Sequence, residues 1–246
     1  MLLRIAVISD IHGNRTAFEA ILRDLKQTSP DLVMHGGDLA DSGSSPAEIV
    51  DQIRGLGWHG VLGNTDEVHT RPESLDEFAA SSKAPASLWR AVREVAEWTH
   101  ERLGKQRIDW LRSLPRLLRR DGIALVHATP ASLWNAPSWE SADAEFSSAY
   151  EALDRPIIIY GHIHRPFLRR VHHPWLNEML IVNSGSVSLS YDGDPRASYV
   201  LIDGSTPTIR RVFYDVDAEM HAILTSGIPR SDWIVRTLRA SAPQLP

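Results

Sequence analysis

The chain has 246 residues, of which 43% are hydrophobic, so it can bury a substantial core in one large domain or two smaller ones. Its formal net charge of −5 argues against a surface that binds extended nucleic acid, and the basic cluster Arg116, Arg119 and Arg120 is interpreted as a solvated strand end. The absence of cysteine excludes disulfides and thiolate metal ligands and is consistent with a reducing compartment.

The first quarter of the chain alternates between apolar β-branched runs and amphipathic helical patterns. Buried strands are predicted at Leu2–Ser9, Leu32–His35 and Trp58–Leu62. Helices are predicted between them, over Thr16–Lys26 and from Ser45-Pro46 to Leu56, where a serine cap precedes a proline in the first turn. This β-α-β-α-β order predicts a parallel sheet with helical crossovers.

The pattern changes between Pro72 and about Leu114, where the chain reads as helical and Ser74-x-x-Glu77 forms a capping box. We expect this insertion to pack over the functional site and to select the substrate. The alternative is a helical pair that only thickens the fold.

The second half is predicted to be more antiparallel, with two hairpins and two closing helices. The expected strands are Leu117–Arg119, Ile123–His127, Pro156–Tyr160, Phe167–Val171 paired with Met179–Asn183, and Tyr199–Ile202 paired with Thr208–Tyr214; the expected helices are Ser141–Leu153, Asp217–Thr225 and Ser231–Ala240. The last few residues are expected to fray.

Seven side chains of the types that bind metals follow the ends of these strands. They are Asp10, His12, Asp38, Asn64, His127, His162 and His164. In open α/β sheets, sites form at the carboxyl ends of the strands, so these side chains are expected to meet. Two Asp, four His and one Asn can hold two ions that share one carboxylate, and Asp38 in its Gly-Gly-Asp turn is the candidate bridge. The set indicates a metal-dependent hydrolase, with phosphate esters as the favoured substrates.

The motifs around these residues resemble the calcineurin-like metallophosphoesterase family. They are SDIHGN (9–14), GGDLAD (36–41), GNTDE (63–67), VHATP (126–130), YGHIHRP (160–166) and NSGSV (183–187), and DGDPRASY (192–199) is similar to a tail in a bacterial and archaeal branch. The resemblance implies a four-layer α/β/β/α sandwich of two packed mixed sheets. It implies a single domain over 1–246, with the helical insertion at about 72–114 and C-terminal helices at about 217–240.

The resemblance also implies a distribution of the ligands over two ions. Asp10, His12, Asp38 and His164 would hold one ion, and Asp38, Asn64, His127 and His162 the other. A hydroxide bridging the ions would attack a phosphate mono- or diester. Two divalent ions against two carboxylates leave a positive pocket, which attracts an anionic ester. The mixed nitrogen and oxygen set favours Mn²⁺, with Fe or Zn²⁺ as alternatives.

Catalytic roles are predicted for Asp38, Asn64, Asp66 and His127, and substrate contacts for Asn14 and Asn64. In the protein-phosphatase branch a His follows the Asn and serves as the general acid. Here Thr65 stands at that position and cannot donate a proton near neutral pH, so Asp66 is expected to orient a neighbouring His or water.

The sequence leaves several alternative interpretations open. Asn14 either contacts substrate or caps the following helix, and Ser184–Ser186 either binds phosphate or forms a strand-end turn. Trp134 and Trp139 are expected near the site, and the His residues outside the motifs are expected to be structural or at the surface. The rival functions are a nuclease of the same superfamily and an interaction module that has lost catalysis.

The segment MLLRIAVISD lacks the charged start and cleavage site of a signal peptide, and no apolar run reaches membrane-spanning length. We therefore expect a cytoplasmic protein whose partner is a small phosphate ester, without a membrane or extended nucleic acid. The oligomeric state is left open.

Overall fold

The computed structural model describes residues 3–246 and contains two five-stranded sheets, each mixing parallel and antiparallel strands. In order across the first sheet, the strands are β10 (Thr206–Val212), β9 (Ala197–Asp203), β1 (Arg4–Ile8), β2 (Leu32–His35) and β3 (His59–Gly60). In order across the second, they are β4 (Leu117–Arg120), β5 (Ile123–Val126), β6 (Ile157–Tyr160), β8 (Asn177–Asn183) and β7 (Phe167–His173). The β1, β2 and β3 strands are parallel, as are β5, β6 and β8, so each sheet has a parallel centre.

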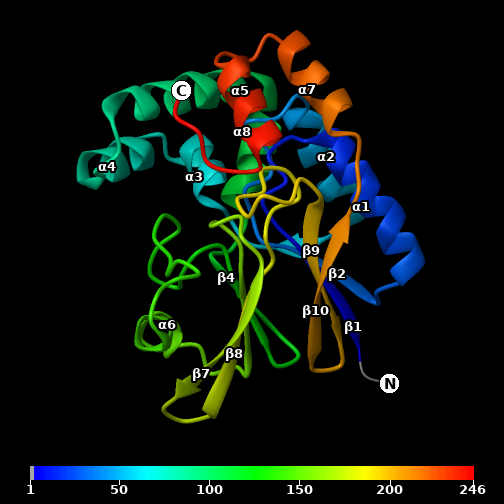
Figure 1. Ribbon diagram of the computed structural model, residues 1–246, viewed down its shortest axis with the longest axis vertical. Helices are drawn as coiled ribbons and strands as arrows, with labels where there is room; N and C mark the ends of the chain where they lie inside the picture. The colour runs from blue at the N-terminus through cyan, green and yellow to red at the C-terminus, as the bar shows by residue number, and fades with distance from the viewer. Residues whose placement is uncertain (1–2) are drawn as a thin grey trace.

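Eight helices accompany the sheets within the described residues. They are α1 (Arg15–Thr28), α2 (Pro46–Leu56), α3 (Asn64–Thr70), α4 (Glu73–Ser81), α5 (Ala86–Arg112), α6 (Asp143–Tyr150), α7 (Val216–Thr225) and α8 (Ser231–Ala240). Figure 1 shows α1 and α2 beside the first sheet, α6 beside the second, and α4, α5 and α8 gathered at one end of both. None of these helices, within residues 3–246, combines the length and apolar character needed to cross a bilayer.

The alternation of side chains along the central strands accounts for the layers. Ile5 and Val7 of β1 point into a core between the two sheets, whereas Ala6 and Ile8 pack against the helical layer that contains Phe18. In the second sheet, Ile157 and Ile159 join the core between the sheets, and the alternate residues Ile158 and Tyr160 pack on Phe146 and Tyr150 of α6. This confirms the predicted four-layer α/β/β/α sandwich.

The observed elements depart from the sequence-based expectation in a few places. The first strand begins at Arg4. It was predicted to begin at Leu2, which lies outside the described residues. The segment after Gly63, for which no element was predicted, forms α3. The predicted insertion consists of α4 and α5, and α5 breaks at Gly104, whose φ of 64° is left-handed.

The last residues of the chain were expected to fray, but in the structure they form hydrogen bonds with α8. The Trp233 indole N–H donates to the Gln244 carbonyl at 2.8 Å, and an Arg236 guanidinium N–H donates to the Leu245 carbonyl at 3.2 Å. These bonds fold the end of the chain back onto α8, next to the end of the sandwich where α4 and α5 lie (Figure 1).

Candidate metal centre

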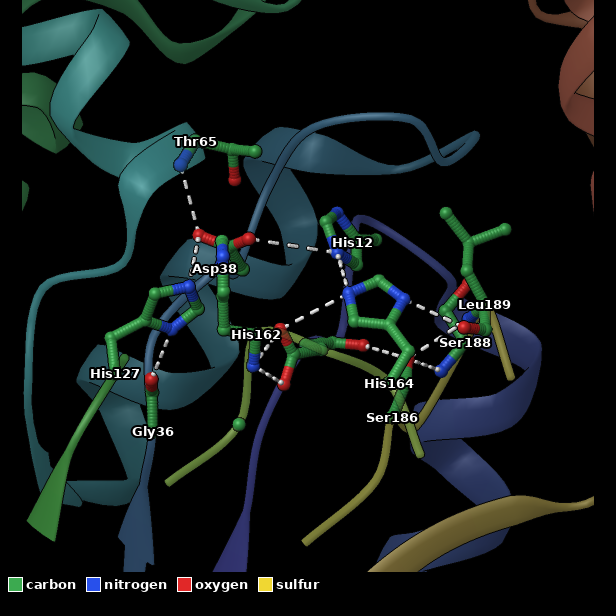
Figure 2. A network of polar contacts seen from close by, with 12 residues as sticks. His12, Gly36, Asp38, Thr65, His127, His162, His164, Ser186, Ser188 and Leu189 are labelled. Carbon is green, nitrogen blue, oxygen red and sulfur yellow. Dashed lines mark hydrogen bonds and ion pairs between the residues drawn. The ribbon is translucent and has the colours of Figure 1, made fainter. Parts of the chain in front are cut away.

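All seven predicted ligands lie where the parallel strands end. Asp10 and His12 follow β1, Asp38 follows β2, and Asn64 is the first residue of α3 after β3. His127 follows β5, while His162 and His164 follow β6. Because the parallel centres of both sheets end on the same side, residues 154 positions apart in the chain meet at one site. Figure 2 shows five of these side chains converging there: His12, Asp38, His127, His162 and His164.

Four of the seven form a compact group that can hold one metal ion. One ligand atom from each of Asp10, His12, Asp38 and His164 lies within 4.8 Å of the other three, and all four residues are buried. The His12 Nε2 and His164 Nε2 atoms are 3.1 Å apart, and His164 Nε2 is 3.2 Å from Asp10 Oδ1. Such spacing between several acceptor-bearing side chains is what a bound cation requires.

The other three predicted ligands, Asn64, His127 and His162, gather on the opposite side of Asp38. The Asn64 Oδ1 atom is 2.8 Å from His127 Nε2 and 2.9 Å from His162 Nδ1. Asp38 connects the two groups, since its Oδ1 is 3.5 Å from His127 Nε2 and its Oδ2 is 3.7 Å from His12 Nε2. One oxygen of Asp38 therefore faces each group.

Backbone carbonyls fix the orientation of all four imidazoles. The second ring nitrogen of His12 is 2.9 Å from the Asp41 carbonyl, that of His127 is 2.8 Å from the Gly36 carbonyl, and that of His164 is 2.7 Å from the Leu189 carbonyl. For His162, it is Nε2 that lies 3.1 Å from the Trp134 carbonyl.

A carbonyl oxygen can only accept, so in each ring the nitrogen facing the carbonyl carries the proton. The other nitrogen then directs its lone pair to the centre of the site. This arrangement is typical of metal-binding histidines, whose remote N–H is held by an outer partner.

The electrostatics of the site act differently on its histidines, lowering the pKa of His12 and His162 and raising that of His127. Burial, together with the neighbouring His127, lowers the pKa of His162 to about 4, and burial together with His164 lowers the pKa of His12. Burial also depresses the pKa of His127, but the Asp38 and Asp10 carboxylates more than offset it, so this pKa is raised. Burial alone would raise the pKa of Asp10, yet the surrounding histidines, His164 first, lower it.

The backbone of the site adopts an uncommon conformation at most of the predicted ligands. Five of the seven ligands have a left-handed φ: 57° at Asp10, 50° at His12, 53° at Asp38, 64° at His162 and 54° at His164. Residues with a Cβ seldom adopt this conformation, and they keep it only where surrounding contacts impose it. The turns thereby point neighbouring side chains, such as Asp10 and His12, toward the same centre.

Gly63 allows the turn between β3 and α3 to approach closely the turn after β2 that carries Asp38. A Cβ at this position would lie 2.1 Å from Asp38 Oδ1 and 2.2 Å from the Asp38 backbone nitrogen. Any side chain here would push the β3–α3 turn away from Asp38, so the glycine of the Gly-Asn motif is required by packing.

Asp66 connects the turn that carries Asp38 to the turn that begins at Gly63. Its buried carboxylate accepts from the backbone N–H groups of Asp38 at 2.8 Å, Leu39 at 3.0 Å and Gly63 at 3.1 Å. Burial, with the nearby Asp38 carboxylate, raises the pKa of Asp66 to about 6. The groups that it orients are thus the turns that carry Asp38 and Asn64, where the sequence had suggested a His or a water.

Thr65 lies at the edge of the site with its backbone N–H donating to Asp38 Oδ1 at 2.9 Å (Figure 2). Its buried hydroxyl has no hydrogen-bond partner within the described residues. The contact therefore steadies Asp38 through the backbone, independently of the side chain.

Asn14 and the Ser184–Ser186 turn both form hydrogen bonds around the turn after β1, which carries Asp10 and His12. The Asn14 Oδ1 accepts from the Ala17 N–H at 2.8 Å, so the capping alternative is confirmed, and its amide donates to Ser188 Oγ at 3.1 Å. The Ser186 hydroxyl donates to the Asp10 carbonyl at 2.8 Å. Both segments therefore hold the first turn in place.

Two acidic residues within the quoted motifs were not singled out from the sequence. Asp41 contacts His69 at 3.3 Å and presents its carbonyl to His12, and Glu67 accepts from the Trp134 indole at 2.7 Å. Their membership of GGDLAD and GNTDE was the only signal available. Trp134 lies at the site as expected, whereas the Trp139 ring stacks on Arg165 and is 44% exposed.

A family model described as the calcineurin-like phosphoesterase superfamily domain matches residues 3–206. The crystal structure of a metallophosphoesterase from Sphaerobacter thermophilus is similar, with a TM-score of 0.79 and 28% identity, covering 98% of this chain and 100% of that one. The hypothetical protein PH1004 from Pyrococcus horikoshii shares the fold, with a TM-score of 0.80 at 17% identity, covering 98% and 99% of the two chains. The uncharacterized protein MJ0912 of Methanocaldococcus jannaschii is 28% identical, over 94% of this chain and 95% of its own.

Proposed function

The chain belongs to the calcineurin-like phosphoesterase superfamily, and on this basis we propose that it hydrolyses phosphate mono- or diesters with two divalent metal ions. The family and the group formed by Asp10, His12, Asp38 and His164 support a metal-dependent phosphoesterase in general. The number of ions, the type of ester and the roles of individual residues belong to the proposal.

The observation that carries the proposal is the arrangement of the imidazoles. Four rings are locked by backbone carbonyls so that four lone pairs meet the oxygens of Asp10, Asp38 and Asn64. Seven acceptors in one buried place repel one another unless cations lie among them. This donor set suits Mn²⁺ best in our proposal, with Fe or Zn²⁺ as alternatives, because imidazole ligands disfavour Mg²⁺ and Ca²⁺.

We assign one ion to Asp10, His12, Asp38 and His164, and the other to Asp38, Asn64, His127 and His162. Bound there, the pair would acidify a water molecule and offset the charge of the phosphate oxygens. The protein contributes two carboxylates and five neutral ligands, so the loaded site keeps a positive charge that attracts an anionic ester.

The remaining predicted residues take positioning roles in this proposal. Asp66 fixes the turns of Asp38 and Asn64, and Asn14 fixes the first turn through its cap and Ser188. Both side chains are buried and neither lines the cavity over the site, so we assign them positioning roles in place of contacts with the phosphate. Of the residues assigned to the second ion, Asn64 lines the cavity over the site, whereas His127 is fully buried and acts as a ligand.

The rival functions receive less support. An interaction module that has lost catalysis would not need a complete set of seven ligands with fixed tautomers. A nuclease of the same superfamily would need a basic groove, and the formal net charge is −5.

The test is an assay with 4-nitrophenyl phosphate and bis(4-nitrophenyl) phosphate before and after metal removal. We expect EDTA to abolish turnover and Mn²⁺ to restore it. Asp38→Asn should lower turnover and the metal content at both positions together, because its two oxygens face the two groups. Undiminished hydrolysis in a protein shown to be metal-free would contradict the proposal.

A further inference from the structure

The metal centre opens into a cavity of about 420 Å³ whose walls differ sharply in character from its floor. The floor is polar and includes His12, Asp38 and Asn64. The walls are mostly apolar and come from five separate parts of the chain: α3, α4 with α5, the loop after β5, the loop after β8, and α8 with the residues that follow it. A volume of this size matches sites that enclose small molecules.

The aromatic part of the wall is held rigidly against the metal centre. Phe78 of α4 stacks on Trp134 with ring centroids 4.8 Å apart, and Trp89 of α5 meets Phe78 edge-on at 5.4 Å. Trp134 is tied at both ends, since its indole donates to Glu67 at 2.7 Å and its carbonyl faces His162 at 3.1 Å. The wall is therefore built into the site, and its geometry is coupled to a metal ligand.

The charge of the cavity limits what can fill it. Within the described residues 3–246, neither Lys nor Arg is among the side chains that line it, and its carboxylates are Asp38 and Asp41. A second phosphate or a carboxylate on the substrate would enter this space without a cationic partner and would have to shed its hydration. A single phosphate held by the metals, with an uncharged remainder, avoids that cost.

We propose that this cavity binds the ester group of the substrate, and that the substrate is a phosphate ester with one phosphate and a large apolar group. The apolar group, an alkyl chain or an aromatic ring, lies against Phe78, Leu88, Trp89 and Val92 while the phosphate meets the metal centre. This inference rests on the proposed function for the position of the phosphate. It also gives α4 and α5 the role in substrate choice that the sequence suggested.

The test uses alkylphosphonates, which keep the phosphate-like head and cannot be hydrolysed. Their affinity for the Mn²⁺-loaded protein is measured by calorimetry from methyl- to hexylphosphonate, with phenylphosphonate to compare a ring with a chain. We expect affinity to rise about four-fold for each buried methylene. We expect 2-carboxyethylphosphonate to bind no better than ethylphosphonate, because its added charge finds no partner.

Two variants locate the effect. Leu88→Lys places a cation in the wall and should flatten the dependence on chain length. Val92→Thr keeps the shape of a side chain that is only partly buried and adds a hydroxyl to the wall, so it should weaken the dependence. Leu224→Lys is the matched control, since Leu224 is 49% exposed on α7 and does not line the cavity. Each variant is compared by its own ratio of hexyl to methyl affinity, which cancels changes in metal loading.

The outcomes separate this inference from the proposed function. A flat series in the wild-type protein, or a steep series that Leu88→Lys and Val92→Thr leave unchanged, would overturn the apolar substrate. Turnover of 4-nitrophenyl phosphate is measured on the same samples. Turnover with a flat series would refute the cavity inference alone, and a steep series without turnover would refute the phosphoesterase proposal and leave the apolar site standing.

Discussion

Replacing Asp66 by Asn tests how the turns of the metal centre are held. The carboxylate accepts three backbone N–H groups, two on Oδ2 and one on Oδ1. An amide offers one oxygen, so even in its better orientation the Leu39 N–H loses its acceptor and the new NH₂ group faces a donor. Two buried groups left unpaired cost about 2–6 kcal/mol together. For a chain of this length, we expect Tm to fall by roughly 10 °C.

The effect on activity should be smaller than the loss of a ligand. Residues that hold metal ligands typically change affinity or activity by about 10–100-fold when replaced. We therefore expect Asp66→Asn to retain both metals at saturating Mn²⁺ and to lose turnover within that range. Asp203→Asn is the control, because the Asp203 side chain is 72% exposed. Scanning calorimetry, metal analysis and the nitrophenyl assay give the three readouts, and an unchanged Tm in Asp66→Asn would refute the positioning role.

Three further predictions concern single side chains. Because Thr65 cannot donate a proton, nitrophenyl esters should be cleaved faster than alkyl esters, by up to the roughly 10²–10⁴-fold that a general acid contributes. Equal rates for the two ester types, with the chemical step shown to be rate-limiting, would contradict this. Thr65→His should favour alkyl esters selectively, and a uniform change across both ester types would argue against a restored acid. Burial, with His59 nearby, lowers the pKa of His35 to about 3. Between about pH 6.5 and pH 3, this histidine is therefore protonated in the unfolded chain and neutral in the folded chain. The free energy of unfolding then falls by about 1.4 kcal/mol for each pH unit toward pH 3. In urea titrations at pH 6.5 and 4.5, His35→Leu should show a shallower loss than wild type or the exposed-site control His221→Leu, and equal slopes would contradict the buried neutral ring.

The sequence was informative where local pattern and tertiary structure agree. The continuous run before Asp10 and the apolar stripe with Phe18 specify a buried strand and the helix that packs on it. Parallel strands then bring their carboxyl ends together, so the meeting of the ligands followed from strand order. The family resemblance, and not the residue types alone, supplied the division of ligands between two ions.

Other features depend on contacts that no local pattern records. The α3 helix begins at Asn64, and its start is set by Asp66 bonding back to the Gly63 N–H and across to the Asp38 turn. The left-handed backbone at Asp38 is likewise imposed by neighbouring turns, since Asp has no intrinsic preference strong enough to predict it.

The apolar cavity was also outside the reach of sequence. Phe78, Trp89 and Trp134 lie in separate segments, and apolar residues at helical spacing look the same whether they fill a core or line a site. Only the packing of α4 and α5 over the metal centre distinguishes the two.

We propose that seven side chains hold two ions, with Asp38 between them. The most direct measurement is an anomalous difference map from crystals of the protein loaded with Mn²⁺. We expect two peaks, one among Asp10, His12, Asp38 and His164 and the other among Asp38, Asn64, His127 and His162, with one oxygen of Asp38 at each. A single peak, or two peaks without Asp38 as a shared ligand, would contradict it.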